Sequence, residues 1–189
     1  DLSGNNITLL AGVLNSPFYS GDATEEENLG GIGMIIAHEI THAFDSSGSQ
    51  YDSNGNLRNW WAQDDAKKFE ELGQSVVDYY SAQSVRGMQV DGQLTLGENI
   101  ADLGAMACVS AVAKQRGLDL RKVYAAYANL WAEEVRDEYL ANQVTTDSHA
   151  PGKVRVNAVL SATDDFYDAF GITEQDAMYV APEDRPRIW

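Results

Sequence analysis

The sequence predicts a mostly helical α+β fold with little sheet, and three observations support this prediction. The length of 189 residues suits one domain with a full-sized core. Several long stretches repeat apolar residues at the helical period, whereas only two short stretches have the composition of a strand. The sequence has no internal repeat, low-complexity tract or linker. We therefore expect residues 1–189 to form a single domain.

The first half of the chain is expected to hold one strand and two helices. Residues 7–14 (ITLLAGVL) are apolar and β-leaning, which predicts a strand or a hairpin arm. A helix is expected from about 29 to 44, and the glycines near its start indicate close packing against a neighbouring element. After a loop at 46–57, apolar spacing predicts a helix from about 60 to 83.

The second half is expected to be helical, with clear signals at several helix ends. Gly117 stands where a helix stop is expected, and Asp119 is a suitable N-cap for the helix after it. Ser161 and Asp164 form an S-x-x-D start for a last short helix. The predicted segments are a loop at 86–94, helices at 95–116, 119–136 and 138–144, a loop at 148–153, an extended stretch at 154–160, and a helix that ends at Gly171.

The composition excludes several classes of partner. The net charge is −16 and the sequence pI is about 4.3, so the surface would repel nucleic acid and anionic membranes. No run approaches the roughly 20 apolar residues that span a bilayer. Cys108 is the only cysteine, which excludes an internal disulfide and a zinc site built from cysteines. Its apolar surroundings favour a buried structural thiol.

The stretch IAHEITHAFD, residues 36–45, contains two of the three histidines. On a helix His38 and His42 share a face, and Glu39 lies beside them. This is the H-E-x-x-H arrangement of two zinc ligands and a general base. The structural alternative is a buried amphipathic helix with two satisfied histidines. The motif therefore needs a third ligand.

The downstream stretch TLGENIAD, residues 95–102, supplies two candidate carboxylates. Glu98 and Asp102 are four residues apart, so they share a helix face. One can bind a metal while the other accepts a hydrogen bond from a ligand histidine. The alternative is a capping box, in which Glu98 only satisfies a backbone N–H at the helix start beside Thr95. Together with H-E-x-x-H, the pattern favours the metal interpretation.

Two further residues leave alternatives open. His149 lies in a loop of Ser, Ala, Pro and Gly with no apolar face to fill, so a functional role and a solvated loop histidine are equally supported. Asp45 follows His42 by three residues. It is either a second carboxylate partner for a histidine or a surface charge at the helix end.

The two motifs, in this order, resemble the catalytic domain of the neprilysin family of zinc metallopeptidases. The resemblance covers nearly the whole chain, from about Ile7 to Trp189. It includes GGIGMIIAHEITHAFDSSGSQYDSNGNLRNWW with its paired tryptophans, DSHAPGKVRVNAVLSATDDFYDAF, and the terminal RIW. Because the chain has no cysteine near its C-terminus, where the animal members carry one, we expect a bacterial member.

The resemblance implies a zincin, or thermolysin-like, metallopeptidase fold with a small edge β-sheet and one zinc ion per chain. It implies a role for each matching residue: His38, His42 and Glu98 bind zinc, Glu39 is the general base, Asp102 orients His38, His149 stabilises the oxyanion, and Arg155 holds the substrate backbone. The expected activity is endopeptidase cleavage of short peptides. The alternative is an inactive or peptide-binding module that retains the fold.

The resemblance also implies that the chain is the C-terminal catalytic part of a longer peptidase, with a helical cap domain upstream in the same polypeptide. The expected partners are peptide substrates and that cap domain. Leu10 and Ser16 stand where the family usually has proline, which bears on the shape of the substrate edge. The compartment stays open between the cytoplasm and a bacterial cell-surface or secreted location.

Overall fold

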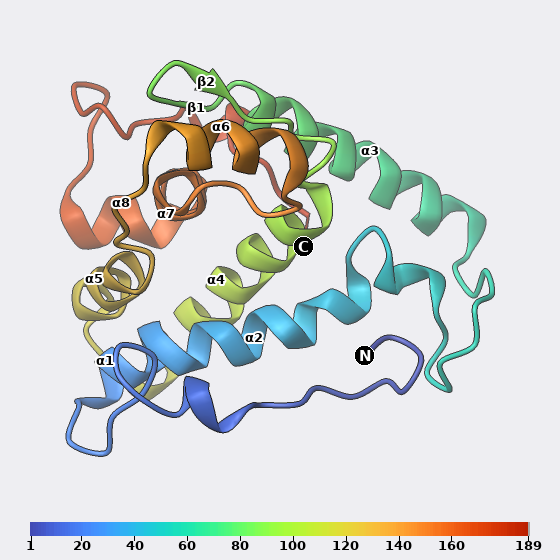
Figure 1. Ribbon diagram of the computed structural model, residues 1–189, viewed down its shortest axis with the longest axis horizontal. Coiled ribbons are helices and arrows are strands. Elements are labelled where there is room, and N and C mark those ends of the chain that lie inside the picture. The colour runs from blue at the N-terminus through green and yellow to red at the C-terminus, as the bar shows by residue number, and fades with distance from the viewer. Residues whose placement is uncertain (189) are drawn as a thin grey trace.

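The computed structural model describes residues 1–188 (Figure 1). Trp189, the last residue of the RIW terminus, lies outside the described residues. The helices are α1 (Glu25–Asn28), α2 (Met34–Thr41), α3 (Gln63–Ser81), α4 (Leu96–Arg116), α5 (Leu120–Leu130), α6 (Asp137–Thr146), α7 (Gly152–Ser161) and α8 (Asp164–Phe170). The strands β1 (Ser84–Val85) and β2 (Met88–Gln89) pair in an antiparallel sheet.

Helix α4 is the central element, and α2 packs along it (Figure 1). It separates two apolar clusters, contributing Met106 and Val109 to one and Ile100 to the other. Its length and composition alone would suffice to cross a membrane, but half of that window is buried inside the fold, as expected for a core helix. Cys108 lies on the outside of α4 and is exposed, so the expectation of a buried thiol was wrong. Apolar neighbours in sequence did not indicate which face of the helix it occupies.

The helix that carries the histidines begins earlier than predicted. A capping box between Thr24 and Glu27 starts α1, and a π-helical turn over Leu29–Gly33 joins it to α2. The glycines in this turn do pack closely, as predicted. A Cβ on Gly30 would lie 2.2 Å from the carbonyl oxygen of Val123 in α5. The absence of a side chain at Gly30 therefore lets α5 approach the turn that precedes α2.

The prediction of extended structure was wrong for two segments. Residues 7–14 contain a short 3₁₀ turn at Ala11–Val13 and form no strand within the described part of the chain. The stretch 154–160 is instead the body of α7, where Val154, Ala158 and Val159 are buried against the core. Tertiary packing overrides the β propensity of valine there. The small sheet instead lies at 84–89, partly inside the segment predicted as a loop.

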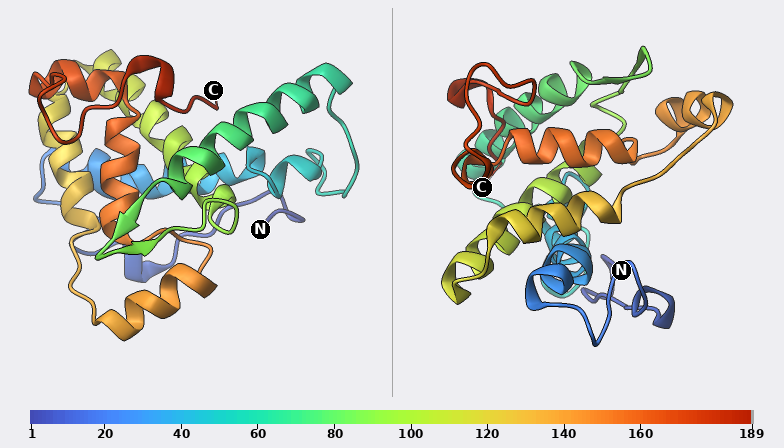
Figure 2. Two further views of the ribbon diagram at one scale, coloured as in Figure 1. Left: turned by 90° about the horizontal axis from the view of Figure 1, so that it is seen from above. Right: turned by 90° about the vertical axis from the view of Figure 1, so that its left-hand side faces the viewer.

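Helix ends were predicted better than strands. Gly117 and Gly171 both have φ of 67° and end α4 and α8, as predicted. Asp119 caps α5 by accepting the Arg121 N–H, although α5 stops at Leu130 and does not reach 136. Ser161 is the last residue of α7 and does not cap α8. Figure 2 shows α3 projecting from the other helices and the N-terminal segment beside α2.

Candidate metal centre

The centre lies where α2 and α4 pack together. His38 and His42 share one face of the helix, with their Nε2 atoms 3.0 Å apart. Glu98 Oε2 lies 3.1 Å from the Nε2 of His38 and 3.4 Å from that of His42. Ligand atoms at about 2.0–2.1 Å from a tetrahedral zinc are about 3.3 Å from one another. These three donors therefore fit three corners of a zinc site.

The Nδ1 atom of each histidine lies within hydrogen-bond distance of a carboxylate. His38 Nδ1 lies 2.8 Å from Asp102 Oδ1, and His42 Nδ1 lies 2.5 Å from Asp45 Oδ2. Asp45 also accepts the backbone N–H groups of Ser47 and Gly48, so it is anchored where the helix ends. Asp45 is thus a carboxylate partner of His42 and not a free surface charge. Such contacts fix the ring orientation and leave Nε2 for a metal.

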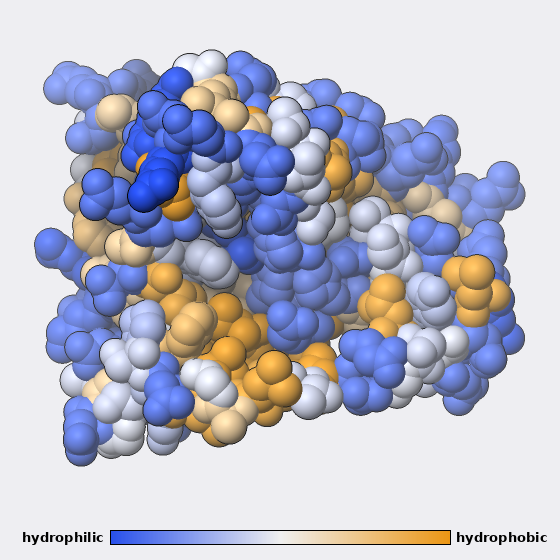
Figure 3. Space-filling model, in the orientation of Figure 1, coloured by the Kyte–Doolittle hydropathy of each residue, from blue (hydrophilic) through white to orange (hydrophobic). Residues whose placement is uncertain are grey.

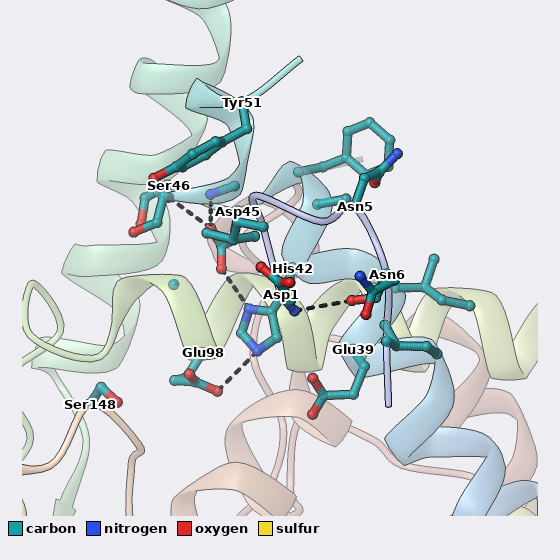
Figure 4. Close-up of a pocket in the computed structure, with 18 of the residues that line it drawn as sticks. Asp1, Asn5, Asn6, Glu39, His42, Asp45, Ser46, Tyr51, Glu98 and Ser148 are labelled. Atoms are coloured by element: carbon teal, nitrogen blue, oxygen red, sulfur yellow. Dashed lines mark hydrogen bonds and ion pairs between the residues drawn. The ribbon is translucent and has the colours of Figure 1, made fainter. Parts of the chain in front are cut away.

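The orientation of Glu98 argues against the capping alternative. Thr95 makes no side-chain cap bond; its hydroxyl donates to the Asp91 carbonyl and accepts from the Asn99 amide. Glu98 instead extends from α4 toward His42 (Figure 4), and its carboxylate also lies close to His38. Its carboxylate is therefore part of the histidine cluster.

Arg155 is tied to the same cluster through Asp102. Its Nε donates to Asp102 Oδ2 at 2.8 Å and its Nη2 to Oδ1 at 2.7 Å. Both residues are buried. Burial alone would raise the pKa of Asp102, but the Arg155 charge and the His38 hydrogen bond outweigh it and lower that pKa. Asp102 thus links Arg155 to His38, a connection that the sequence did not indicate.

His149 reaches the cluster from the loop before α7. Its Nε2 lies 3.1 Å from Glu98 Oε2, and its Nδ1 lies 2.8 Å from Asp147 Oδ1. Asp147 also accepts the His149 backbone N–H. The sequence interpretation missed Asp147; the only signal was an Asx-type spacing two residues before the histidine. His149 is therefore not a free loop histidine.

Glu39 faces a cleft of about 910 Å³ that His42 and Glu98 also line (Figure 4). Within residues 1–188 its carboxylate has no hydrogen-bond or ion-pair partner. Apolar side chains gather over the N-terminal segment and α2 (Figure 3), and those of Ile7 and Ile40 border the same cleft. The cleft thus combines an unpaired carboxylate, the donor cluster and apolar walls.

The sequence profile described as peptidase family M13 matches residues 2–185. The chain belongs to peptidase family M13. Among relatives of this M13 chain, a neutral endopeptidase of Lactobacillus helveticus is 39% identical over 100% of the chain, and human neprilysin is 36% identical over 98%. The predicted neprilysin-family resemblance is confirmed. The chain spans only 29% and 27% of the length of these two relatives.

Solved structures of M13 peptidases share the fold. A zinc metalloprotease of Mycobacterium tuberculosis in complex with an inhibitor superposes with a TM-score of 0.94 at 34% identity, covering 100% of this chain and 32% of that one. A protein described as PEPO from Lactobacillus rhamnosis gives a TM-score of 0.88 at 37% identity, covering 93% of this chain and 28% of that one. The predicted fold class, a mostly helical metallopeptidase fold with a small sheet, is confirmed.

In this M13 site, three histidines hydrogen-bond to one carboxylate, that of Glu98. Burial alone would lower the pKa of His42, but its hydrogen bonds to Asp45 and Glu98 outweigh burial and raise it to about 10. Burial alone would raise the pKa of Glu98, but hydrogen bonds from His149, His38 and His42 hold it well below its usual range. Three histidines around an ionised glutamate form a site in which a divalent cation can replace protons.

Proposed function

We propose that the protein is a zinc-dependent endopeptidase that cleaves short peptides. The observation that carries this proposal is the donor set of His38, His42 and Glu98, with mutual spacings of 3.0–3.4 Å, beside the unpaired carboxylate of Glu39. Family M13 implies zinc, and the spacings of these three donors fit it. In this proposal the three donors hold one zinc ion per chain.

Zinc in such a site supplies Lewis acidity: it lowers the pKa of a water molecule to about 7 and polarises a peptide carbonyl. The work of Glu39 is proton transfer. As an unpaired carboxylate at the cleft wall, it accepts the proton of the attacking water and delivers it to the leaving amine. Asp102 and Asp45 keep the Nδ1 atoms of the two histidines occupied, so that their Nε2 atoms stay directed at the donor cluster.

His149 and Arg155 are proposed to hold the substrate. Asp147 occupies Nδ1 of His149, so its Nε2 is the nitrogen that faces the cluster and can donate to a developing oxyanion. Arg155 uses Nε and Nη2 on Asp102, which leaves Nη1 for a peptide carbonyl. A helical cap domain, elsewhere in the same polypeptide, is the further partner in this proposal.

The test is Glu39→Gln in the full-length protein. We expect zinc content to stay at about one per chain while kcat falls by about 100- to 10,000-fold. Glu71→Gln is the matched control, because this glutamate is exposed on α3. Peptide cleavage by Glu39→Gln at the wild-type rate would refute the general-base role. Peptide binding by the wild type without any cleavage would favour the peptide-binding module instead.

A further inference from the structure

Tyr80, near the end of α3, carries a buried hydroxyl group that residues 1–188 leave unpaired. The residue is 0% exposed, and its hydroxyl has no hydrogen-bond partner among the described residues. A hydroxyl in such a place costs free energy, because it has lost its hydrogen bonds to bulk water. Phenylalanine would fill the same space without that cost. The hydroxyl therefore indicates a partner other than the side chains around it.

Tyr80 packs against α4 and α7, the helices that carry the buried ion pair behind the metal centre. Its ring belongs to the apolar cluster that contains Ile100 of α4 and Val154 of α7. Burial raises the pKa of Tyr80 well above its usual value; the negative charge of Asp102 raises it further, and the positive charge of Arg155 lowers it. Tyr80 thus lies close enough to this ion pair to interact with both charges.

The Asp102 carboxylate has one acceptor position left. The two oxygens of an ionised carboxylate offer about four lone-pair positions. Oδ1 accepts from His38 Nδ1 and from Arg155 Nη2, and Oδ2 accepts from Arg155 Nε. The remaining position therefore lies on Oδ2. Because Asp102 is only 2% exposed, bulk water does not reach it.

A donor without an acceptor and an acceptor with a free position therefore lie in the same buried region. No direct hydrogen bond joins the two groups within residues 1–188. A buried water molecule needs at least two polar partners, and these groups supply them. We propose that Tyr80 is a positioning residue of the metal centre, whose hydroxyl holds Asp102 through one buried water molecule. This water accepts the Tyr80 hydroxyl and donates to Asp102 Oδ2.

The water acts on the metal centre through Asp102. Arg155 holds the carboxylate from α7, and the water adds a contact from α3. Held from both helices, Oδ1 keeps its place at His38 Nδ1, and the Nε2 atom of His38 stays directed at the donor cluster. The effect on zinc rests on the proposed function, whereas the water site does not.

The first test is a pair of high-resolution crystal structures, of the full-length protein and of its Tyr80→Phe variant. We expect an ordered water molecule within hydrogen-bond distance of both Tyr80 Oη and Asp102 Oδ2, and we expect the variant to lose it. A direct hydrogen bond between the two groups, or no water between them, would overturn the proposal. This readout needs neither zinc nor catalysis.

The second test measures zinc affinity by competition with a chelator. We expect Tyr80→Phe to weaken zinc binding about 3- to 10-fold, less than the roughly 10- to 100-fold for a direct partner of a ligand histidine. Tyr124→Phe is the matched control, because its buried hydroxyl lies 2.9 Å from Ser110 Oγ in the other apolar cluster. It should leave zinc affinity unchanged.

The same substitution in an Asp102→Ala background separates positioning from a general effect on the fold. There Tyr80→Phe should not weaken zinc binding further, because the carboxylate that the water holds is gone. An equal loss of zinc affinity in both backgrounds would overturn the proposal, and so would an unchanged affinity in the Tyr80→Phe single variant.

Thermal unfolding of the metal-free protein distinguishes a hydroxyl paired with water from an unpaired one. A paired hydroxyl stabilises the fold, so Tyr80→Phe should lower Tm by about 1–4 °C. Removing an unpaired hydroxyl ends its desolvation cost, so a Tm equal to or above that of the wild type would contradict the proposal. A wild-type protein that binds no zinc would refute the proposed function separately, and the unfolding and crystallographic tests would still decide the water site.

Discussion

Removing the Asp102 carboxylate tests the buried network most directly. Asp102 is 2% exposed and accepts from three nitrogens: Nδ1 of His38, and Nε and Nη2 of Arg155. In Asp102→Ala all three lose their acceptor at once. Arg155 then becomes a buried cation without a counter-charge, because no other carboxylate among the described residues forms an ion pair with it.

Breaking a buried ion pair from one side costs about 3–5 kcal/mol, since the remaining charge stays desolvated. For a protein of this size, 1 kcal/mol lowers Tm by about 2–4 °C, so we expect Asp102→Ala to lower Tm by about 6–20 °C. The lost hydrogen bond to His38 should also weaken zinc binding by about 10- to 100-fold. The first effect concerns folding, and the second concerns the metal.

The assay is thermal unfolding of the metal-free protein, followed by zinc titration against a chelator. The control is Asp165→Ala, which removes a half-buried aspartate whose 2.6 Å pair with the exposed Lys114 is expected to contribute at most about 1 kcal/mol. Adding Arg155→Met to Asp102→Ala should recover part of the lost stability, because the unpaired cation is removed. A Tm within about 2 °C of wild type for Asp102→Ala would refute the reasoning.

Four further predictions concern the metal centre and the start of α7. Glu98→Ala should reduce zinc from about one per chain to a small fraction, and elemental analysis that finds unchanged zinc would exclude Glu98 as a ligand. Gly152→Ala should destabilise the protein by about 1–3 kcal/mol, because the added Cβ would lie 2.8 Å from two oxygen atoms; denaturant unfolding measures the loss. The control is Gly73→Ala, which should not destabilise, because a Cβ there would have no atom within 4 Å. The pKa of His42 is raised to about 10 in the metal-free site, so His42 must lose a proton to bind zinc. Because the pKa of His38 is raised as well, apparent zinc affinity should rise by about tenfold or more per pH unit from pH 6 to 8. In the metal-free protein, stability from protonated His42 is fully present below its unfolded pKa of about 6.5 and is lost as pH rises through about 10, which pH-dependent unfolding measures. A flat affinity profile would contradict the assigned protonation.

Much of the site could be predicted from the sequence because its signals are local. The i and i+4 spacings of His38 with His42, and of Glu98 with Asp102, place each pair on one helix face whatever the rest of the fold does. Helix stops such as Gly117 can also be predicted from the local sequence, because glycine readily adopts a φ of 67°. The family resemblance then indicated that the two motifs belong to one site.

The tertiary structure decided what depends on contacts between distant segments. The stretch 154–160 has the valines of a strand but is the helix α7, because its apolar face is buried against the core. Residues 7–14 are β-leaning and form no strand, since a strand needs a partner for its backbone groups and none pairs with them within residues 1–188. The link from His38 through Asp102 to Arg155 joins α2, α4 and α7. Local propensity carries no information about such a link, because only packing brings the three helices together.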